Sequence, residues 1–600
     1  MIIGIDFGTS TSEVAYINKE GKPEVIANHL GEVVTPSAVY FDENHQPHVG
    51  QIAMEKLLIE PENTVIEVKR LLGSDKILTI RDKTYTPIEV AAYIVTYLIE
   101  CAEKHIDEEI TGAVITVPAF STDAQRRATI AIGEKTGIKV ERLINEPTAA
   151  SLDYGIDRRA DCSNILVYDF GGGTLDVTVL ELFEGVIDVK ASAGNNLLGG
   201  KDIDAKLINH MTQEITKKQP AEITKDIHAM TRLKKSAEEA KIALSNQQEY
   251  EISLPFITTD KKGNPVGYDE TITRSTFNKI ITELVESTKE QIELALSDAS
   301  LEKTDLDFVM LVGGTTKIPL ISDFLETELG IKPKIYHDPV LSVVRGAAIE
   351  AAIIEGRYDE DALVLTDVCP YSLSTEVAHD SDYFFGAVHT YCDILIKRNR
   401  TIPITVHKIY YTMHDDQKQV DIKVYQGESK DPEENIQLGT VKLDGIPKAK
   451  AGKERIKIEF SYDLNGLLIV TGQILSNGKT VIAEIETSNI AIEIDLDNWE
   501  SKKIARKYRT IINKGERFLV GLQQKENTDI ESILHKKAID LTMEDLHEGL
   551  QTIMNEATTE ELGKTIKFLI NKLKRGIINE ENASELDEIK DKLLDLYEEI

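Results

Sequence analysis

Apolar residues follow two alternating patterns along the first part of the chain. Short continuous runs, such as residues 165–168 and 308–312, are bounded by turn-forming residues and predict buried strands. Longer segments with apolar residues at helical spacing, such as 122–135 and 275–295, predict amphipathic helices. Strands and helices that alternate in this way are typical of an α/β fold, which we predict for residues 1–358.

The pattern changes after this part of the chain. Val420 and Ile422 are separated by a polar residue, as in a strand with one buried face. The Asn-Gly pairs at 465–466 and 477–478 are typical of hairpin turns. Residues 371–495 therefore predict an all-β module, most simply a β-sandwich.

Two further segments complete the organisation. Residues 496–600 are highly charged, with apolar residues at helical spacing, and predict a small α-helical bundle. A short apolar run at 361–368, inside a connecting segment at 359–370, lies between acidic residues. Composition favours an edge strand there, and a linker that docks and undocks is the alternative.

Composition narrows the functional classes. The chain has 600 residues, whereas single cores stop growing at roughly 250–300 residues, so several domains are expected. The formal net charge of -34 argues against nucleic acid as the main partner, because phosphate contacts need clustered Lys and Arg. The four cysteines form no CxxC pair, and no basic leader or run of about 20 apolar residues is present. These features predict a cytoplasmic protein with reduced thiols and no membrane partner.

A glycine-containing motif occurs twice and carries most of the functional prediction. Residues 5–9 read Ile-Asp-Phe-Gly-Thr, and residues 168–174 read Tyr-Asp-Phe-Gly-Gly-Gly-Thr. In each copy an apolar strand precedes the motif, and a valine (Val14 or Val177) at the same distance from the Asp opens a second strand. One such hairpin would be an ordinary glycine-rich turn, but two matching copies indicate a duplicated nucleotide-binding fold.

The two turns supply groups that a nucleotide needs. Their glycines let backbone N–H groups approach an anion, and neighbouring hydroxyls add donors. These residues are Gly8, Thr9, Ser10, Thr11, Gly171, Gly172, Gly173 and Thr174. Asp6 and Asp169 would repel bare phosphate but suit a hydrated Mg²⁺ that is bound to phosphates. A third glycine turn, Gly313-Gly314 followed by Thr315, would complete a cleft between two lobes.

These motifs resemble the seventy-kilodalton heat-shock chaperone family (DnaK-like), over almost the whole chain. Further shared segments are 68–71, 117–119, 144–150, 198–200 and 312–314. Within the family, residues 365–373 and 460–468 are most similar to the divergent HscC branch. The resemblance implies an actin-like (ribonuclease-H-like, duplicated) ATPase domain at 1–358, an interdomain linker at 359–370, a β-sandwich substrate-binding domain at 371–495 and a helical lid at 496–600. It also favours the docking interpretation of the linker.

The resemblance assigns roles to individual residues. Asp6, Glu146 and Asp169 would hold the waters of Mg²⁺, with K⁺ as a further candidate cation. Lys69 and Thr174 would face the γ-phosphate of ATP, and Asp176 would orient the attacking water. Phosphoryl transfer needs little else, because it depends mostly on positioning and charge stabilisation. Further contacts to ATP or ADP would come from Gly199, Gly200, Glu238, Lys241, Ser245 and Lys317.

Three positions depart from the family pattern. Lys317 stands where an arginine usually stacks on adenine, Val340 replaces an acidic residue, and Lys201 stands where glutamate is usual. A lysine stacks less well than a guanidinium, and the segment after Leu72-Gly73 is also shorter than in typical members. We therefore expect nucleotide affinity and the choice of exchange factor to differ while hydrolysis is kept.

The implied partners are an unfolded or extended polypeptide, a J-domain co-chaperone and a nucleotide-exchange factor. The peptide groove would be lined by Tyr410, Met413, Val420 and Ile422, residues that would also suit a sandwich core.

The J-domain dock matches two residues beside the motif at 144–150. They are Arg142 and Asn145, and Arg142 is expected to pair with Asp367 of the linker. Phe120 stands where a tyrosine is common, which suits a dedicated partner.

Three functions are compatible with the predicted ATPase domain. The first is an ATP-dependent molecular chaperone that gates the binding and release of polypeptide. The second is a regulatory ATPase that sequesters one protein partner. The third is a small-molecule kinase of the same fold, which would have no use for a β-sandwich and lid after residue 370.

Overall fold

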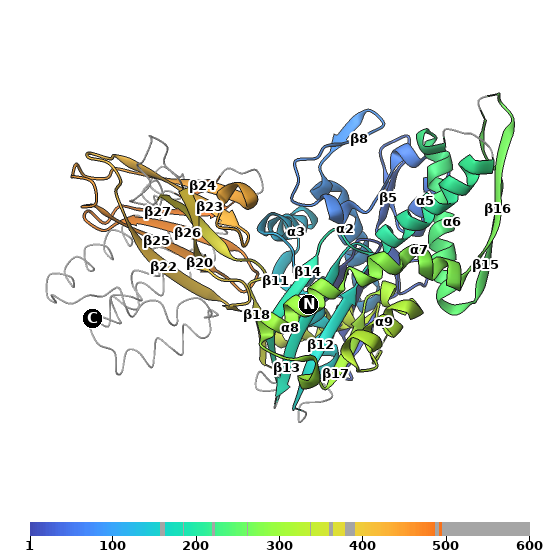
Figure 1. Ribbon diagram of the computed structural model, residues 1–600, viewed down its shortest axis with the longest axis horizontal. Coiled ribbons are helices and arrows are strands. Elements are labelled where there is room, and N and C mark those ends of the chain that lie inside the picture. Colours follow the sequence, from blue (N-terminus) through green and yellow to red (C-terminus); the bar gives the residue numbers. More distant parts are fainter. Residues whose placement is uncertain are drawn as a thin grey trace. The chain divides into compact units, whose positions relative to one another are not determined.

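The computed structural model describes residues 1–155, 162–183, 185–218, 223–260, 262–336, 338–358, 364–378, 390–485 and 491–494 (Figure 1). The chain divides into two compact units. The first contains Met1–Ser372, Lys397–Ile402 and Leu464–Leu467, and the second contains Leu373–Ile396, Pro403–Asp463 and Leu468–Ile600. The predicted lid and residues 359–363 of the predicted linker lie outside the described residues, so both stay predictions.

The first sheet of the first unit combines a hairpin with parallel neighbours. Its strand order is β11-β10-β1-β2-β3, with β4 paired to β2. The strands are β1 (Ile2–Phe7), β2 (Thr11–Ile17), β3 (Pro23–Val25), β4 (Thr35–Pro36), β10 (Gly112–Val117) and β11 (Lys139–Asn145). β1 is antiparallel to β2 and parallel to β10, so the turn between β1 and β2 lies at the carboxyl end of a parallel pair.

The second sheet of the first unit repeats this plan. Its order is β17-β12-β13-β14-β18-β21, and β12 is antiparallel to β13 and parallel to β17. The strands are β12 (Cys162–Phe170), β13 (Leu175–Phe183), β14 (Val186–Asn195), β17 (Phe308–Val312), β18 (Val364–Val368) and β21 (Thr401–Ile402). The arrangement of β12, β13 and β17 matches that of β1, β2 and β10, as the two glycine motifs predicted.

Ten α-helices are found among the described residues. They are α1 (Gln51–Leu57), α2 (Pro87–Ile106), α3 (Asp123–Thr136), α4 (Glu146–Gly155), α5 (Gly200–Lys218), α6 (Ile227–Asn246), α7 (Arg274–Glu286), α8 (Lys289–Ala299), α9 (Pro319–Leu329) and α10 (Ser342–Ile354). α10 packs against β1, β2 and α4. A side chain at Gly4 would overlap the backbone of Ala348, and one at Gly346 would overlap that of Ala149, so glycine permits both close approaches.

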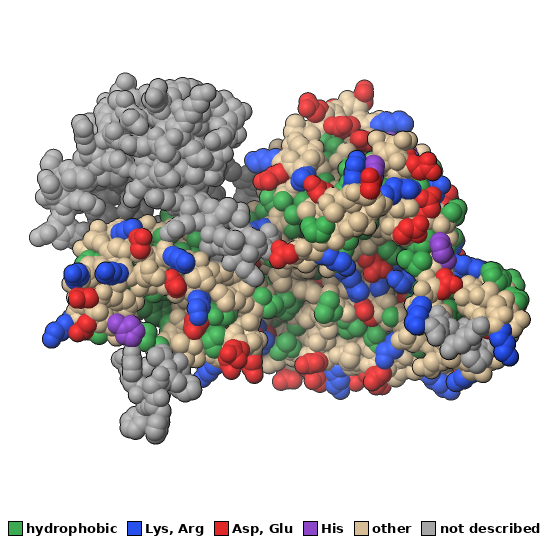
Figure 2. All heavy atoms as spheres, turned by 90° about the horizontal axis from the view of Figure 1, so that it is seen from above, with side chains coloured by type: hydrophobic (Ala, Val, Ile, Leu, Met, Phe, Trp, Pro, Cys, Tyr) green, Lys and Arg blue, Asp and Glu red, His purple; other side chains and the backbone are tan. Residues whose placement is uncertain are grey.

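Smaller strands form three further sheets in the first unit. They are β5 (Ala38–Phe41), β6 (Pro47–Val49), β7 (Thr64–Ile66), β8 (Leu78–Ile80), β9 (Lys83–Tyr85), β15 (Glu249–Thr259) and β16 (Pro265–Thr273). The hairpin β15–β16 packs along α6 (Figure 1). On the face of the first unit in Figure 2, Lys and Arg side chains are interspersed with Asp and Glu.

The predicted helices show where a local pattern is sufficient. The helix predicted at 122–135 is α3, which Thr122 caps by accepting a hydrogen bond from the N–H of Gln125. The single helix predicted at 275–295 is wrong, because the chain forms α7 and α8 with a break at Ser287 and Thr288. The Thr288 hydroxyl is buried and accepts a hydrogen bond from Tyr168 of β12 at 3.0 Å. A long-range contact therefore coincides with a break that apolar spacing does not reveal.

The apolar run after residue 363 forms β18, which is added to the second sheet. It pairs in parallel with β14, where Val186 lies opposite Val364 and Ile187 opposite Leu365. β18 also pairs with β21 on its other side. The run is thus a strand near the sheet edge, and the same pairing is what a docked linker would form.

The second unit is a two-sheet β module. One sheet has the order β20-β19-β23-β24, and the other has the order β22-β25-β26-β27-β28. The strands are β19 (Leu373–Ala378), β20 (Thr390–Ile396), β22 (Ile404–Tyr411), β23 (Gln419–Gln426), β24 (Ile436–Asp444), β25 (Arg455–Tyr462), β26 (Leu468–Ile474), β27 (Thr480–Ile485) and β28 (Ala491–Ile494). Alternate residues of β25 and β26 are buried, as expected for strands with one face against a core. Gly466 and Gly478 have φ values of +69° and +75°, which suits the predicted turns.

Candidate active site

The two glycine turns of the first unit pack against each other. A Cβ on Gly172 would meet the hydroxyl of Ser10, and one on Gly173 would meet the side chain of Thr9. Gly199 approaches the backbone of Gly173 equally closely. Small residues are therefore needed where the turns meet, and the turns form one wall of a cleft.

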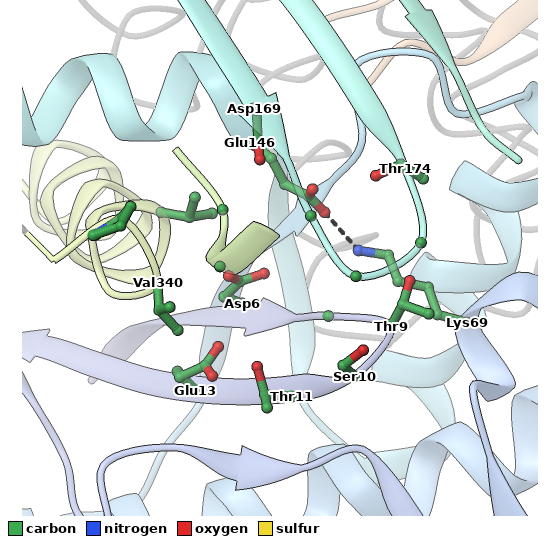
Figure 3. A pocket seen from close by; sticks show the side chains of 18 residues that line it. Asp6, Thr9, Ser10, Thr11, Glu13, Lys69, Glu146, Asp169, Thr174 and Val340 are labelled. Atoms are coloured by element: carbon green, nitrogen blue, oxygen red, sulfur yellow. Dashed lines mark hydrogen bonds and ion pairs between the residues drawn. The ribbon is translucent and has the colours of Figure 1, made fainter. Parts of the chain in front are cut away.

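The cleft brings together most of the predicted nucleotide-binding residues (Figure 3). From the predicted set it is lined by Asp6, Gly8, Thr9, Ser10, Thr11, Lys69, Glu146, Asp169, Gly171, Gly172, Gly173, Thr174, Gly313 and Gly314. Glu13, Pro339, Val340 and Val343 also line it. The third glycine turn thus reaches the same cleft as the two hairpins.

Each hairpin carries two carboxylates that lie directly opposite each other. Asp6 of β1 pairs in register with Glu13 of β2, and Asp169 of β12 pairs with Asp176 of β13. All four side chains are buried. Like charges in such positions repel, and burial adds a desolvation cost, so these groups are poised for a cation.

Burial perturbs the acidity of this group. Desolvation, followed by the charge of Glu146, raises the pKa of Asp6 to about 7 and that of Asp176 to about 7. Desolvation and neighbouring carboxylates raise the pKa of Asp169 well above its usual value. Desolvation, followed by the charge of Asp6, does the same to the pKa of Glu13. Binding of a cation would favour the ionised forms.

The carboxylate set fits a hydrated magnesium ion better than a bare one. Within the described segments, no group of three or more His, Cys, Asp or Glu side chains is close enough to hold a metal directly. One oxygen of Asp169 and one of Asp176 are buried and lack a hydrogen-bond partner among the described residues. Magnesium usually keeps several of its waters, which could reach these oxygens.

Lys69 is the cation placed beside the carboxylates. It lies in a short 3₁₀ segment (Val68–Leu71), and its Nζ is 2.6 Å from Oε1 of Glu146 (Figure 3). Both side chains are mostly buried. Glu67, the residue before this 3₁₀ segment, has a φ of +59°. The segment therefore follows a residue in the left-handed region, which is uncommon for residues other than glycine. The structure therefore joins two residues that the resemblance named separately.

Asp176 is held by the chain segment that follows β10. Its Oδ1 accepts a hydrogen bond from the backbone N–H of Phe120 at 3.2 Å. Asp176 does not line the cleft, although its cross-strand partner Asp169 does.

The predicted adenosine contacts lie outside the cleft lining and have partners within the protein. Glu238 of α6 pairs with Lys201 at 3.1 Å, and Lys241 bonds to Asp204 at 2.9 Å. The Ser245 hydroxyl donates to the Lys241 carbonyl one turn earlier. Lys201, which stands where glutamate is usual, therefore pairs with Glu238, the carboxylate that was predicted to contact the nucleoside.

The remaining predicted contacts surround the third glycine turn. Lys317 pairs with Asp338 at 3.1 Å, and both side chains are about half exposed. Thr315 donates to the Gly171 carbonyl at 2.8 Å, and the Gly200 N–H donates to the same carbonyl at 3.0 Å. Thr315 and Gly200 therefore tie the glycine turns together.

One pairing prediction at the linker is wrong. Arg142 bonds to Glu350 of α10 at 2.5 Å, rather than to Asp367. Asp367 instead accepts hydrogen bonds from Asn145 at 2.8 Å and from Thr148 at 3.1 Å. Glu350 lies 208 positions from Arg142, so sequence proximity to the motif gave no indication of this partner.

The four predicted groove residues of the second unit differ in exposure. Met413 is 40% exposed, Tyr410 and Val420 are partly buried, and Ile422 is 1% exposed. The Tyr410 hydroxyl donates to Asp393 at 2.8 Å. Ile422 therefore packs inside the module, the alternative that the sequence left open for it.

Glu13 is the charged cleft residue that the sequence analysis missed. It stands seven positions after Asp6, as Asp176 stands seven positions after Asp169. The repeat that identified the hairpins therefore contained the signal for a second carboxylate in each of them.

The duplicated hairpins and the carboxylate-lined cleft define a protein with a duplicated nucleotide-binding fold and an attached β module. The model of the Hsp70 protein family matches residues 2–77 and 75–600. Chaperone protein DnaK of Thermotoga petrophila is 43% identical over 481 residues, which cover 80% of this chain and 79% of the relative. Chaperone protein DnaK of Thermosipho melanesiensis is 37% identical over 584 residues, which cover 96% and 95%.

The chain therefore belongs to the Hsp70 family. It is an ATPase and an ATP-dependent molecular chaperone, and neither a small-molecule kinase nor a regulator that sequesters one partner is favoured. None of the helices in the described part of the chain is long and apolar enough to cross a membrane.

Proposed function

We propose that the cleft hydrolyses Mg²⁺-bound ATP with the roles that follow. Asp6, Glu146 and Asp169 would hold the waters of a bound Mg²⁺, and the ion would supply positive charge to neutralise the phosphates. Lys69 and Thr174 face the γ-phosphate, and Asp176 orients the attacking water. The observation that carries this proposal is the convergence of buried carboxylates, one lysine and three glycine turns on one cleft.

The nucleoside end of the site requires a rearrangement of ion pairs. Glu238 and Lys241 bind adenosine only after exchanging contacts with Lys201 and Asp204, and Lys317 competes with Asp338 in the same way. Because these ion pairs must be broken first, adenosine contributes less to the nucleotide affinity of this chain than the phosphates do. K⁺ is a further cation for the carboxylates.

The second unit binds unfolded or extended polypeptide. Tyr410, Met413 and Val420 offer an apolar surface, and an extended peptide would add main-chain hydrogen bonds. Ile422 packs in the interior of the β module beneath this apolar surface. A J-domain co-chaperone acts through Arg142 and Asn145, and a nucleotide-exchange factor acts on the ATPase part.

The chain belongs to the HscC branch of the family and works in the cytoplasm. The domain bounds follow the sequence analysis, with the β-sandwich at 371–495 and the lid at 496–600. The division of the chain near Ser372 supports the first of these bounds.

ATP in the cleft speeds the release of peptide from the second unit, and the dissociation rate of a fluorescent peptide, measured with ATP and with ADP, tests this gate. Faster release in ATP is expected, and Val420→Trp should lower peptide affinity while the melting temperature is kept. Equal release rates in the two nucleotides would overturn the gating mechanism. An unchanged peptide affinity in a folded Val420→Trp protein would reject the groove.

A further inference from the structure

Tyr371 lies next to the residue that holds Asp176. Its ring meets the ring of Phe120 edge-on, with centroids 5.0 Å apart and an interplanar angle of 73°. Its hydroxyl donates to the Phe120 carbonyl at 2.9 Å. Tyr371 and Phe120 both belong to the first unit, although they are 251 positions apart in the sequence.

Phe120 is held at both ends of its backbone. Its N–H donates to Asp176 at 3.2 Å, while its carbonyl accepts from Tyr371 and from the side chain of Asn196, the latter at 2.5 Å. The residue follows β10 and Pro118, beyond the ladder that fixes the strand. Its orientation therefore depends on these side-chain contacts.

The position of Tyr371 depends in turn on β18. The strand ends at Val368, three residues before Tyr371, and the turn between them is fixed within the first unit. Cys369 donates its N–H to Arg400 at 2.9 Å, and its carbonyl accepts from Asn399 at 2.7 Å. Tyr371 can therefore reach Phe120 when β18 is paired with β14.

The Tyr371 hydroxyl is suited to donate a hydrogen bond. Desolvation, followed by the charge of Asp176, raises the pKa of Tyr371, so the group stays protonated at neutral pH. A protonated hydroxyl can donate a hydrogen bond to the Phe120 carbonyl at neutral pH. Phenylalanine at position 371 would keep only the contact with the Phe120 ring.

We propose that Tyr371 is a positioning residue for ATP hydrolysis. When β18 is paired with β14, the Tyr371 hydroxyl fixes Phe120, and the Phe120 N–H holds Asp176 in place. The inference rests on the proposed role of Asp176 as the group that orients water. It makes hydrolysis sensitive to the docking of β18 through one side chain.

The test is single-turnover hydrolysis at saturating ATP in the full-length protein, together with nucleotide affinity. Tyr371→Phe should lower the hydrolysis rate constant by roughly two- to tenfold, the worth of one hydrogen bond, with unchanged nucleotide affinity. Tyr358→Phe is the matched control, because the Tyr358 hydroxyl also donates to a backbone carbonyl, that of Gly21, at 2.6 Å. It should leave the rate unchanged.

Two further variants separate the possible failures. In a Leu365→Asp background, which weakens the pairing of β18, Tyr371→Phe should have no additional effect. A Tyr371→Phe protein that hydrolyses ATP at the parental rate would overturn the inference, and so would an equal loss in both backgrounds. If Asp176→Asn alone left hydrolysis intact, the proposed role of Asp176 would fail, and the inference with it. Melting temperatures would show that each variant is folded.

Discussion

The two glycine hairpins have the same strand plan but different surroundings. In the second hairpin, Asp176 accepts a hydrogen bond from Phe120, which in turn contacts Tyr371 after β18. In the first hairpin, Glu13 occupies the equivalent position, and its Oε1 lacks a hydrogen-bond partner among the described residues. Duplication thus supplied two carboxylates, and only the second has a connection to the strand that leads toward the β module.

The same difference extends to the aspartates that precede the turns. Asp6 accepts a hydrogen bond from Thr116 at 2.6 Å, whereas Asp169 retains a buried oxygen without a partner in the described part of the chain. Hydrogen bonding to the ionised form lowers a carboxyl pKa, which partly offsets burial at Asp6. The second hairpin therefore has more buried carboxylate oxygens without a partner among the described residues, and these could receive the waters of a hydrated cation.

The comparison predicts its largest effect for the pair Asp176→Asn and Glu13→Gln. Asp176→Asn should slow single-turnover hydrolysis by about 10² to 10⁴, the usual range for a positioned acid–base group. Glu13→Gln should change the same rate by much less, because it lacks the connection through Phe120. Comparable losses in the two variants would show that the hairpins act symmetrically.

Lys69→Ala tests the cation that lies between the hairpins. Hydrolysis should fall by about 10² to 10³, since a transition-state contact of this kind is worth roughly 3–4 kcal/mol. Nucleotide binding should be largely kept, because the backbone N–H groups of the glycine turns remain. Rapid-quench measurements of the chemical step, with fluorescence titration of nucleotide, distinguish the two quantities. A parental rate in this variant would refute the role assigned to Lys69.

Leu365→Asp tests the connection of the second hairpin to β18. Leu365 is partly buried opposite Ile187, and a carboxylate there would be desolvated without a partner. The ratio of the peptide dissociation constants in ATP and in ADP should fall toward one. In the parent protein, a coupling free energy of about 1–3 kcal/mol corresponds to a ratio of about 5 to 150. Val364→Asp is the control, because its side chain is 50% exposed and should tolerate charge. Loss of the ratio in both variants would point to general damage to the strand.

The sequence was sufficient where neighbouring residues decide the structure. The hairpins, the strand at 308–312 and the helix capped by Thr122 follow from short patterns of glycine, apolar and capping residues. Long-range contacts were not accessible in this way. The break before α8, where Thr288 meets Tyr168, and the pairing of Arg142 with Glu350 both depend on residues more than 100 positions away.

The same contrast between local patterns and long-range contacts applies to the candidate site. Residues of the glycine turns could be named from the repeat, because glycine-rich turns present backbone N–H groups in a way that suits an anion. Glu238 and Lys241 could be named from the resemblance, but their ion pairs with Lys201 and Asp204 could not, since no local pattern encodes them. Glu13 could have been found by extending the repeat by a few residues.

The smallest expected effect concerns stability and again separates the hairpins. The pKa of Glu13 is raised in the folded protein by desolvation and by Asp6, so ionisation opposes folding. Below pH 4.5, the usual pKa of a glutamate in the unfolded chain, Glu13 is protonated in both the folded and the unfolded state and does not affect the free energy of unfolding. As the pH rises above that value, Glu13 ionises first in the unfolded state, so the free energy of unfolding falls. Glu13→Gln should therefore stabilise the nucleotide-free protein by roughly 1–3 kcal/mol at pH 7, because a difference of one in pKa between the two states corresponds to about 1.4 kcal/mol, and by little at pH 4. Urea unfolding at the two pH values measures this gain. Asp176→Asn, which loses a carboxylate bonded to Phe120, should gain less, and an equal gain at both pH values would show that packing rather than charge is responsible.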